Sequence, residues 1–357
     1  MTAPGGAGIP LSPRLLEDLV QRHGGALRND VHGVVRRLVP VARAGAGDLA
    51  PLLTARYVDA AMAAVARGAL LLIDEALTVR EDVVGLPGWF HPHAAWALAE
   101  LLDGGDAPAD DPVIGEGTTI GRGAILRPRV RVGARVTIGP GAVIGDAGFG
   151  WATGPGGQVR AIPQLGGVVI EDDVHVGALC TIASGTIDPT IVRQRVKLDA
   201  QVHVGHNCEI GEGTVIAAQS GLAGSVVVGR GVLMGGQVGI ADHVVVGDGA
   251  RIAAKSGVIG DVANGSTVAG YPAVERHRWL RGLAELYRLA SNRAGSVPPS
   301  TPGSRAATGS TSPPAPAESP KPPLSSTVPP AANVPAGLRP EAIIRRTEPP
   351  ATTSGES

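Results

Sequence analysis

The chain has 357 residues, a formal net charge of −1, and 52 glycines against four tryptophans, three tyrosines and two phenylalanines. This length leaves room for two or three domains, and the glycine content is typical of turns and thin coils rather than of a thick aromatic core. The near-neutral charge argues against nucleic acid as a partner. Because no apolar run reaches the ~18 residues that span a bilayer and the N-terminus lacks a signal-type pattern, we expect a cytoplasmic protein without a transmembrane segment.

Residues 1–108 are predicted to form an α/β domain. Ser12 is a candidate N-cap, Pro13 a first-turn proline and Gly24 a stop signal, which together indicate a short helix. The remaining apolar patterns predict strands over 31–41 and 69–73 and helices over 54–67 and 92–102. A linker rich in Gly, Asp, Ala and Pro follows at 104–112.

A strict six-residue period governs the next part of the chain. From Val192 to Val258 a large aliphatic residue returns at every sixth position, and a small or β-branched residue stands four positions after each one. This period is neither that of a helix nor that of a simple strand. It is the hexapeptide repeat of a parallel β-helix, in which three short strands make one triangular coil. We therefore expect residues 109–271 to form a β-helix domain.

An earlier block of the same repeat starts at Ile114 and loses its register after Ile144. Residues 146–168 are too many for a tight corner, and insertions in a regular repeat mark a functional surface more often than a structural one. The register resumes at Ile170, slips by four residues at 188–191, and then continues without interruption. The whole repeat predicts about seven coils and a prism ~30 Å long.

Residues 272–294 are predicted to form an amphipathic C-terminal helix. Its apolar face consists of Trp279, Leu280, Leu283, Leu286, Tyr287 and Ala290. The opposite face is rich in arginine, and it is either a solvated surface or a docking surface for an acidic carrier protein. Residues 295–357 consist largely of Pro, Ser, Thr and Ala, and we expect this tail to be disordered.

His206 is the candidate for acid–base chemistry. Because three hexads make one coil, residues 18 apart lie above one another, which places His206 under Gly224 and puts His243 on the same edge at roughly 10 Å. Asp199, at the second position of the preceding hexad, is expected to reach the imidazole and hold it in one tautomer, as a general base requires. Gly224 exposes a backbone N–H that suits a developing oxyanion.

Other chemistries receive less support from the residues. A single histidine at a solenoid corner is more often a plain polar turn residue, and His175, His203 and His277 lack comparable neighbours. The histidines have no fixed spacing to carboxylates or cysteines that would indicate a metal site. Cys180 and Cys208 occupy inward positions of different hexads, where packing is favoured over a disulfide. No P-loop, Gly-x-Ser-x-Gly or dinucleotide motif stands between a predicted strand and helix.

The hexads, in which a small or acidic residue often follows the aliphatic one, resemble those of hexapeptide acyltransferases, whose β-helix is left-handed and whose active forms are trimers. Four segments together resemble a narrower family, the UDP-3-O-acylglucosamine N-acyltransferases of lipid A biosynthesis. These segments are 148–151 (Gly-Phe-Gly-Trp), 162–166 (Ile-Pro-Gln-Leu-Gly), 198–207 (which starts with Leu-Asp and ends with Val-Gly-His-Asn) and 269–273 (Ala-Gly-Tyr-Pro-Ala). The likeness covers about residues 11–292.

By this resemblance His206 is the general base, which takes a proton from the glucosamine 2-amine as that amine attacks an acyl carrier protein thioester. Asp199 then orients the base, and Gly224 supplies the oxyanion N–H. The residues expected to contact substrates are His243 beside the phosphopantetheine or acceptor, Phe149 and Gln164 around the sugar and acyl chain, Asn207, and Tyr57 in the uridine pocket. The resemblance also implies a homotrimer and no metal or dissociable cofactor.

The chain also departs from the family pattern. Ala183 and Ser184 stand where the family commonly has Asp and Arg, which removes two charges from the coil beneath His206. Pro51 and Thr54 replace the aromatic residue and asparagine associated with uracil. Two alternatives therefore stay open. One is a hexapeptide acyltransferase with another acceptor, through O-acylation of UDP-N-acetylglucosamine or sugar N-acetylation, and the other is an inactive scaffold.

Overall fold

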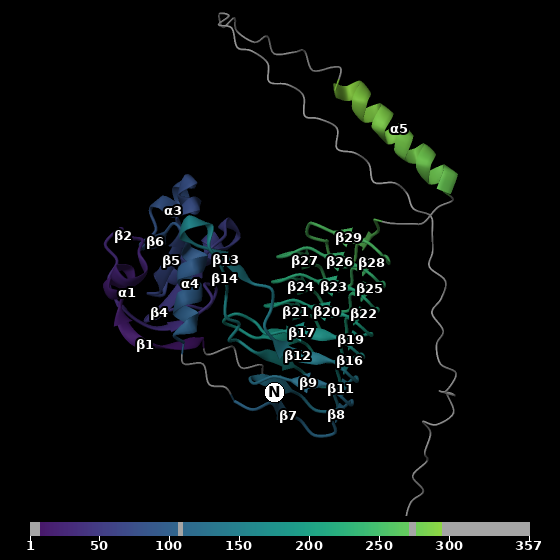
Figure 1. The fold of residues 1–357 in the computed structure, drawn as a ribbon, viewed down its shortest axis with the longest axis horizontal. Helices are drawn as coiled ribbons and strands as arrows, with labels where there is room; N and C mark the ends of the chain where they lie inside the picture. The colour runs from purple at the N-terminus through teal and green to yellow at the C-terminus, as the bar shows by residue number, and fades with distance from the viewer. Residues whose placement is uncertain (1–7, 106–109, 271–275, 295–357) are drawn as a thin grey trace, which may run out of the picture. The chain divides into compact units, whose positions relative to one another are not determined.

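The computed structural model describes residues 8–105, 110–270 and 276–294 (Figure 1). Its contacts group the chain up to Leu283 into one unit and the remainder into a second. The first unit contains a mixed sheet with helices, followed by a stack of short parallel strands. The expected order of an N-terminal α/β domain and a parallel β-helix is therefore confirmed.

The N-terminal domain is built on a six-stranded sheet with the order β1-β3-β4-β5-β6-β2. Its strands are β1 (Ile9–Leu15), β2 (Ala26–Arg28), β3 (Val34–Leu38), β4 (Asp48–Leu52), β5 (Leu70–Asp74) and β6 (Gly88–His91). The central strands β3, β4, β5 and β6 run parallel, whereas β1 and β2 join the two edges antiparallel. The strand β5 is buried on both faces along almost its whole length, and its sequence is accordingly a continuous apolar run instead of an alternation of apolar and polar residues.

Helices cover this sheet and supply its crossovers. They are α1 (Leu16–His23), α2 (Val58–Ala66), α3 (Glu81–Val84) and α4 (Ala94–Asp103), with 3₁₀ turns η1 (Ala55–Tyr57) and η2 (Glu75–Val79). The predicted helices over 54–67 and 92–102 are confirmed. The predicted start of the first helix is wrong, because Ser12 and Pro13 lie in β1 and the helix begins at Leu16. The antiparallel pairing of β1 with β3 outweighs the local cap signals there.

Three parallel sheets form the faces of the β-helix. The first face contains β7 (Val113–Ile114), β10 (Val130–Val132), β15 (Val168–Ile170), β18 (Thr190–Val192), β21 (Glu209–Ile210), β24 (Val227–Val228) and β27 (Val245–Val246). The second contains β8 (Thr119–Ile120), β11 (Thr137–Ile138), β16 (His175–Val176), β19 (Lys197–Leu198), β22 (Val215–Ile216), β25 (Leu233–Met234), β28 (Arg251–Ile252) and β30 (Thr267–Val268). The third contains β9 (Ile125–Leu126), β12 (Val143–Asp146), β17 (Thr181–Ala183), β20 (His203–Val204), β23 (Gly221–Leu222), β26 (Gly239–Ile240) and β29 (Gly257–Val258).

The chain visits the three faces in turn. The first corner joins the first face to the second, the second corner joins the second face to the third, and the third corner returns the chain to the first face. Strands stack in register, so that His203 pairs with Gly221 and Gly221 with Gly239. Corners turn through left-handed residues such as Asn207 and His243, both at φ 59°. With an aliphatic core inside the stack, this is the parallel β-helix that the hexads predict, with the left hand that the resemblance implies.

Two insertions interrupt the coils, and both leave from the third corner. The first contains η3 (Pro155–Gly157) and an antiparallel hairpin of β13 (Trp151–Thr153) and β14 (Val159–Ala161). The second lengthens the next coil, so that Ile170 pairs with Val192, which is 22 residues later instead of 18. The first insertion packs on α4, and its Ile162 and Leu165 join the apolar core of the N-terminal domain.

The helix α5 (Arg276–Ala294) confirms a helix within the predicted range 272–294, of which 272–275 lie outside the described residues. Its apolar side chains Leu280 and Leu286 are 42% and 65% exposed. The disorder predicted for 295–357 concerns residues outside the described part of the chain. Within the three described segments, no helix is long and apolar enough to cross a membrane.

Candidate active site

His206 lies at the third corner, directly after β20, and two glycines enclose its side chain. A methyl group on Gly224 would come within 2.6 Å of the ring atoms Cε1 and Nε2, and one on Gly148 would come within 2.6 Å of the His206 Cβ. Gly224 belongs to the neighbouring coil and Gly148 to the first insertion. The predicted stacking of His206 under Gly224 is therefore confirmed, and the insertion covers the same side chain.

Asn207 holds the Nδ1 side of the imidazole. Its Nδ2 donates to His206 Nδ1 at 2.9 Å and to Thr186 Oγ1 at 3.1 Å, while its Oδ1 accepts from the Thr186 N–H at 2.6 Å. The Thr186 hydroxyl donates to Oε1 of Gln164 at 2.8 Å, and Gln164 Nε2 donates to the Ile162 carbonyl at 3.0 Å. Each donor in this series of hydrogen bonds faces an acceptor. This arrangement fixes the orientation of the side-chain amides of Asn207 and Gln164.

These contacts and the burial of the ring determine the tautomer and the charge of His206. Because Nδ1 accepts a hydrogen bond, the neutral imidazole carries its proton on Nε2, the nitrogen beside Gly224. Burial lowers the pKa of His206 below its ordinary value, and positive charge on His243 and His203 lowers it further. The ring is therefore uncharged at neutral pH.

The backbone N–H of Gly224 is available to a ligand. None of the hydrogen bonds among the described residues uses it as a donor. In the same coil, the equivalent amide at the second corner is that of Ala218, which donates to the Asp199 carboxylate at 3.2 Å. In this coil the third corner thus keeps a free N–H, whereas the second corner uses its own.

The predicted contact of Asp199 with His206 is wrong. Asp199 follows β19 and lies at the second corner, whereas His206 follows β20 and lies at the third, so one strand of the third face separates them. Hexads that are consecutive in sequence occupy different sides of the triangle, which is why the neighbour in sequence is not the neighbour in space. Asn207 is the side chain that contacts the ring.

His243 and Tyr57, which the resemblance assigned to substrates, lie side by side. The Tyr57 ring, from η1, meets the His243 ring edge-on with centroids 6.4 Å apart. Arg56 donates to the His243 carbonyl, and the His243 N–H donates to the carbonyl of Gly224 at 3.0 Å. The Nδ1 of His243 is buried and has no hydrogen-bond partner in the described part of the protein. An unused polar atom therefore stands one coil above Gly224, where both domains meet.

Phe149 and Gln164 differ in how open they are. Phe149 is 88% exposed and meets Trp151 edge-on at 6.0 Å, so its ring is open to a ligand. Gln164 is 7% exposed, and both ends of its amide bond within the protein. Gln164 accordingly supports the site from behind and does not line it.

The sequence reasoning missed Thr186 and His203. Thr186 lies in the second insertion, and the break in register was the signal that could have singled it out. His203 sits on β20, close enough for its charge to act on His206. Ala183 and Ser184, which stand where the family commonly has Asp and Arg, are buried, and the hydroxyl of Ser184 donates to the Gly145 carbonyl at 2.7 Å. A backbone carbonyl thus satisfies the one polar side chain of this pair.

The two cysteines point into the core, as predicted. Cys180 and Cys208 are 0% and 1% exposed, and burial raises the pKa of Cys208 to about 12. No group of three His, Cys, Asp or Glu side chains is arranged to hold a metal ion in the segments that the structure describes.

The bacterial transferase hexapeptide family (six repeats) matches residues 111–146 and 189–224, and the second match includes His206 and Gly224. A curated UDP-3-O-acylglucosamine N-acyltransferase from Caulobacter vibrioides (strain NA1000 / CB15N) is 51% identical over 45% of this chain and 48% of its own length. One from Anaeromyxobacter dehalogenans (strain 2CP-1 / ATCC BAA-258) is 42% identical over 52% of this chain and 54% of its own. The chain therefore spans about half the length of the curated relatives it matches.

Among solved structures, a UDP-N-acetylglucosamine acyltransferase from Campylobacter jejuni is 26% identical, with a TM-score of 0.37 over 43% of this chain and 58% of that chain. The repeat that holds His206 is thus of the bacterial transferase hexapeptide kind, and about half of the chain is similar to UDP-3-O-acylglucosamine N-acyltransferases.

Proposed function

We propose that this protein is an N-acyltransferase of lipid A biosynthesis, which moves an acyl or hydroxyacyl chain from acyl carrier protein to the 2-amine of UDP-3-O-acylglucosamine. The observation that carries the proposal is the third corner, where a neutral His206 lies against the free backbone N–H of Gly224. The similarity to curated UDP-3-O-acylglucosamine N-acyltransferases supports the choice of substrate.

In the proposed reaction the sugar amine attacks the carbonyl carbon of the thioester and forms the C–N bond. His206 Nε2 accepts the proton that the amine loses, and the carbonyl oxygen becomes an oxyanion. When the C–S bond breaks, the imidazolium returns that proton to the leaving thiolate, so the products are an amide and a free thiol. A positioned base of this kind typically contributes ~10²–10⁴-fold to the rate.

This role requires Nε2 to be unprotonated when the amine arrives. In the structure the proton of the neutral ring lies on Nε2, because Asn207 donates to Nδ1. Base catalysis therefore requires the Asn207 oxygen to leave the Thr186 N–H and to accept from a protonated Nδ1 when the acceptor binds. Catalytic hydrogen bonds commonly tighten or rearrange only in the substrate complex.

The other groups of the corner have complementary roles in the proposal. The Gly224 N–H donates to the carbonyl oxygen as negative charge develops there. A fixed dipole of this kind stabilises the transition state more than the bound substrate. The unpartnered Nδ1 of His243 hydrogen-bonds the acceptor or the phosphopantetheine arm. Tyr57 stacks on the uracil ring, and the exposed Phe149 contacts the acyl chain.

The proposal includes two macromolecular partners. His206 and Gly224 are partly exposed on the outside of the β-helix, so a second copy would enclose the substrates, and a homotrimer gives every copy such a neighbour. Acyl carrier protein is acidic, and Arg278, Arg281 and Arg288 of α5 are exposed and suited to its surface. Both partners are cytoplasmic in this proposal.

Intact-mass measurement of the products tests the function. The full-length protein is incubated with acyl carrier protein thioester and either a 3-O-acylated UDP-glucosamine or UDP-N-acetylglucosamine. We expect an amide on the first acceptor and no product on the second. An ester on the second acceptor alone would assign the protein to O-acylation, and no product on either would support the inactive scaffold. His206→Ala should lower turnover by ~10²–10⁴-fold.

A further inference from the structure

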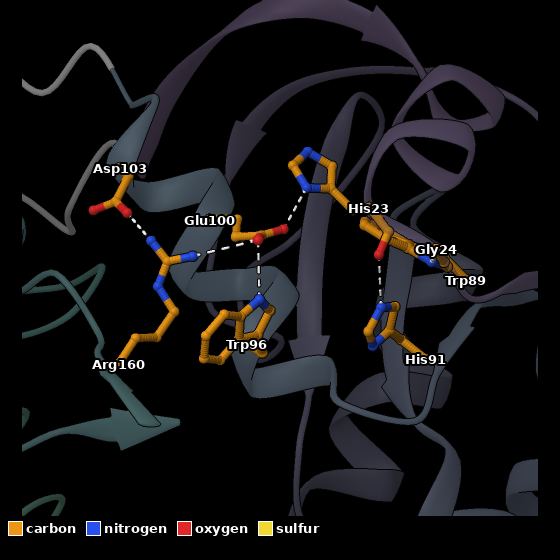
Figure 2. A network of polar contacts seen from close by, with 8 residues as sticks. All are labelled: His23, Gly24, Trp89, His91, Trp96, Glu100, Asp103 and Arg160. Atoms are coloured by element: carbon orange, nitrogen blue, oxygen red, sulfur yellow. Dashed lines mark hydrogen bonds and ion pairs between the residues drawn. The ribbon is translucent and has the colours of Figure 1, made fainter. Parts of the chain in front are cut away.

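The hairpin of the first insertion is anchored on α4 of the N-terminal domain (Figure 2). Arg160, on β14, places its guanidinium 5.0 Å from the centre of the Trp96 ring, and its Nη1 lies 3.4 Å from Glu100 Oε1. The same guanidinium donates to Asp103. A methyl group on Gly154 would come within 2.4 Å of the Trp96 ring, so the hairpin backbone also packs on the indole.

Glu100 is the centre of this network. It accepts from Trp96 Nε1 at 2.9 Å and pairs with His23 Nδ1 at 2.6 Å, and the His23 side chain is only 10% exposed. Burial by itself raises the pKa of Glu100, but the hydrogen bonds from His23 and Trp96 outweigh it, so the pKa lies below its ordinary value. The carboxylate is therefore charged at neutral pH and available to Arg160.

The position of His23 is itself fixed by β6. His91 Nε2 bonds to the His23 carbonyl at 2.9 Å, and Trp89 Nε1 donates to the Gly24 carbonyl at 2.8 Å (Figure 2). Trp89 is fully buried. The anchor of the hairpin thus rests on the packed core of the N-terminal domain and not on a loose surface pair.

A short path joins this anchor to His206. Two residues after Arg160, the Ile162 N–H extends the hairpin by donating to the Gly150 carbonyl at 2.9 Å, and the Ile162 carbonyl accepts from Gln164. Gln164 accepts from Thr186, and the adjacent Leu165 N–H donates to the Thr186 carbonyl at 3.0 Å. Thr186 in turn holds Asn207 through the two hydrogen bonds described above.

We propose that Glu100 and Arg160 are positioning residues for His206, acting through Gln164, Thr186 and Asn207. This inference rests on the proposed function for its catalytic meaning, although the geometry that it concerns exists without substrate. The supporting groups of an active site fix the rotamer and tautomer of the residue that reacts. Here the N-terminal domain supplies that support from outside the repeat.

The first experiment measures His206 directly in the full-length, substrate-free protein. Imidazole ¹⁵N and ¹³C resonances are recorded against pH, with His206 assigned by the signal lost in His206→Gln. In the wild type we expect one set of resonances with an unprotonated Nδ1. Arg160→Met, Glu100→Gln and Thr186→Val should each give His206 a second set of resonances, because the ring is no longer held in one orientation. They should also move the titration of His206 up towards its ordinary range, because water reaches a ring no longer held under Gly148.

Arg80→Ala is the matched control, because Arg80, in the N-terminal domain, is likewise an ion-paired arginine, bonded to Asp82 at 2.7 Å. It should leave the His206 resonances unchanged. Arg160→Lys, which keeps the charge but not the planar fork, should give an intermediate spectrum. If Arg160→Met and Glu100→Gln both leave the resonances and titration of His206 as in the wild type, the inference is wrong.

The acyl-transfer assay supplies the second readout. We expect Arg160→Met to lower kcat on the order of tenfold with little change in KM, below the ~10²-fold that a full 1 Å misplacement costs. An unchanged kcat in Arg160→Met would also overturn the inference. If the wild type transfers no acyl group while the resonances shift as expected, the proposed function fails and the positioning by Glu100 and Arg160 stands.

Discussion

Gly224→Ala provides a sharp test of the catalytic corner, because it changes one hydrogen into a methyl group directly against the imidazole. Gly224 is not among the residues with positive φ, so alanine is conformationally allowed there. Ala200 and Ala218 occupy the same hexad position at the second corner. The backbone should therefore accept the substitution, and the effect should be confined to His206.

The structure gives the size of the disturbance. The new Cβ would lie 2.6 Å from Cε1 and Nε2 of His206, whereas ordinary contact begins at 3.4 Å, which leaves a shortfall of 0.8 Å. The ring is the far end of a side chain and can swing away, so we expect the free energy of unfolding to change by less than ~1 kcal/mol. A misplacement of 1 Å costs up to ~10²-fold in rate, so turnover should fall by nearly that factor.

The assay is acyl transfer followed by product mass, with thermal unfolding measured on the same samples. Gly236→Ala is the control, since Gly236 holds the equivalent position at the second corner and a methyl group there meets only the Ala218 carbonyl, at 3.2 Å. Its turnover should stay near that of the wild type. If Gly224→Ala also keeps near wild-type turnover, His206 does not react from beneath Gly224 and the proposed mechanism fails.

Three further outcomes follow from the same structure. His203→Gln removes a charge that lowers the pKa of His206, so that pKa should rise. Since the rate depends on neutral His206, the acid limb of kcat/KM should move to higher pH, and an unmoved limb would exclude His206 as the titrating group. Asp199→Ala should lower the free energy of unfolding by ~1 kcal/mol, because it removes the acceptor of two backbone amides. Its kcat should change by less than ~3-fold, whereas a ~10²-fold loss of kcat would show that Asp199 takes part in catalysis. Light scattering should give about three times the chain mass of 36.0 kDa, and a monomer in dilute buffer would contradict the trimer.

The regular part of the fold could be predicted because its determinants are local and repeated. Each hexad places one aliphatic side chain inward, and stacking adds the same contact at every coil, so the period alone specifies the β-helix. The start of the first helix could not be predicted in this way. Ser12 and Pro13 carry helix signals, but the pairing of β1 with β3 depends on residues more than twenty positions away.

For the site, only the stacking of residues between neighbouring coils could be predicted from the sequence. The 18-residue period correctly places His206 beneath Gly224, because stacking follows from the repeat itself. Which side chain flanks the ring depends on the corner that each hexad occupies, and the sequence reasoning placed Asp199 across a corner that it does not share with His206. Thr186 was missed because an insertion has no period from which its position can be calculated.

The corner that carries the candidate chemistry is also the corner where the repeat is broken. A regular coil presents similar corners along its length, and regularity by itself gives no reason for one of them to bind a substrate. Both insertions leave from the third corner, and each contributes to the surroundings of His206. Gly148 of the first covers the side chain, and Thr186 of the second holds Asn207 against the ring. The first insertion also carries the hairpin that Arg160 fixes to α4. The β-helix therefore determines the coil in which His206 lies, while the two insertions orient its ring and connect it to the N-terminal domain.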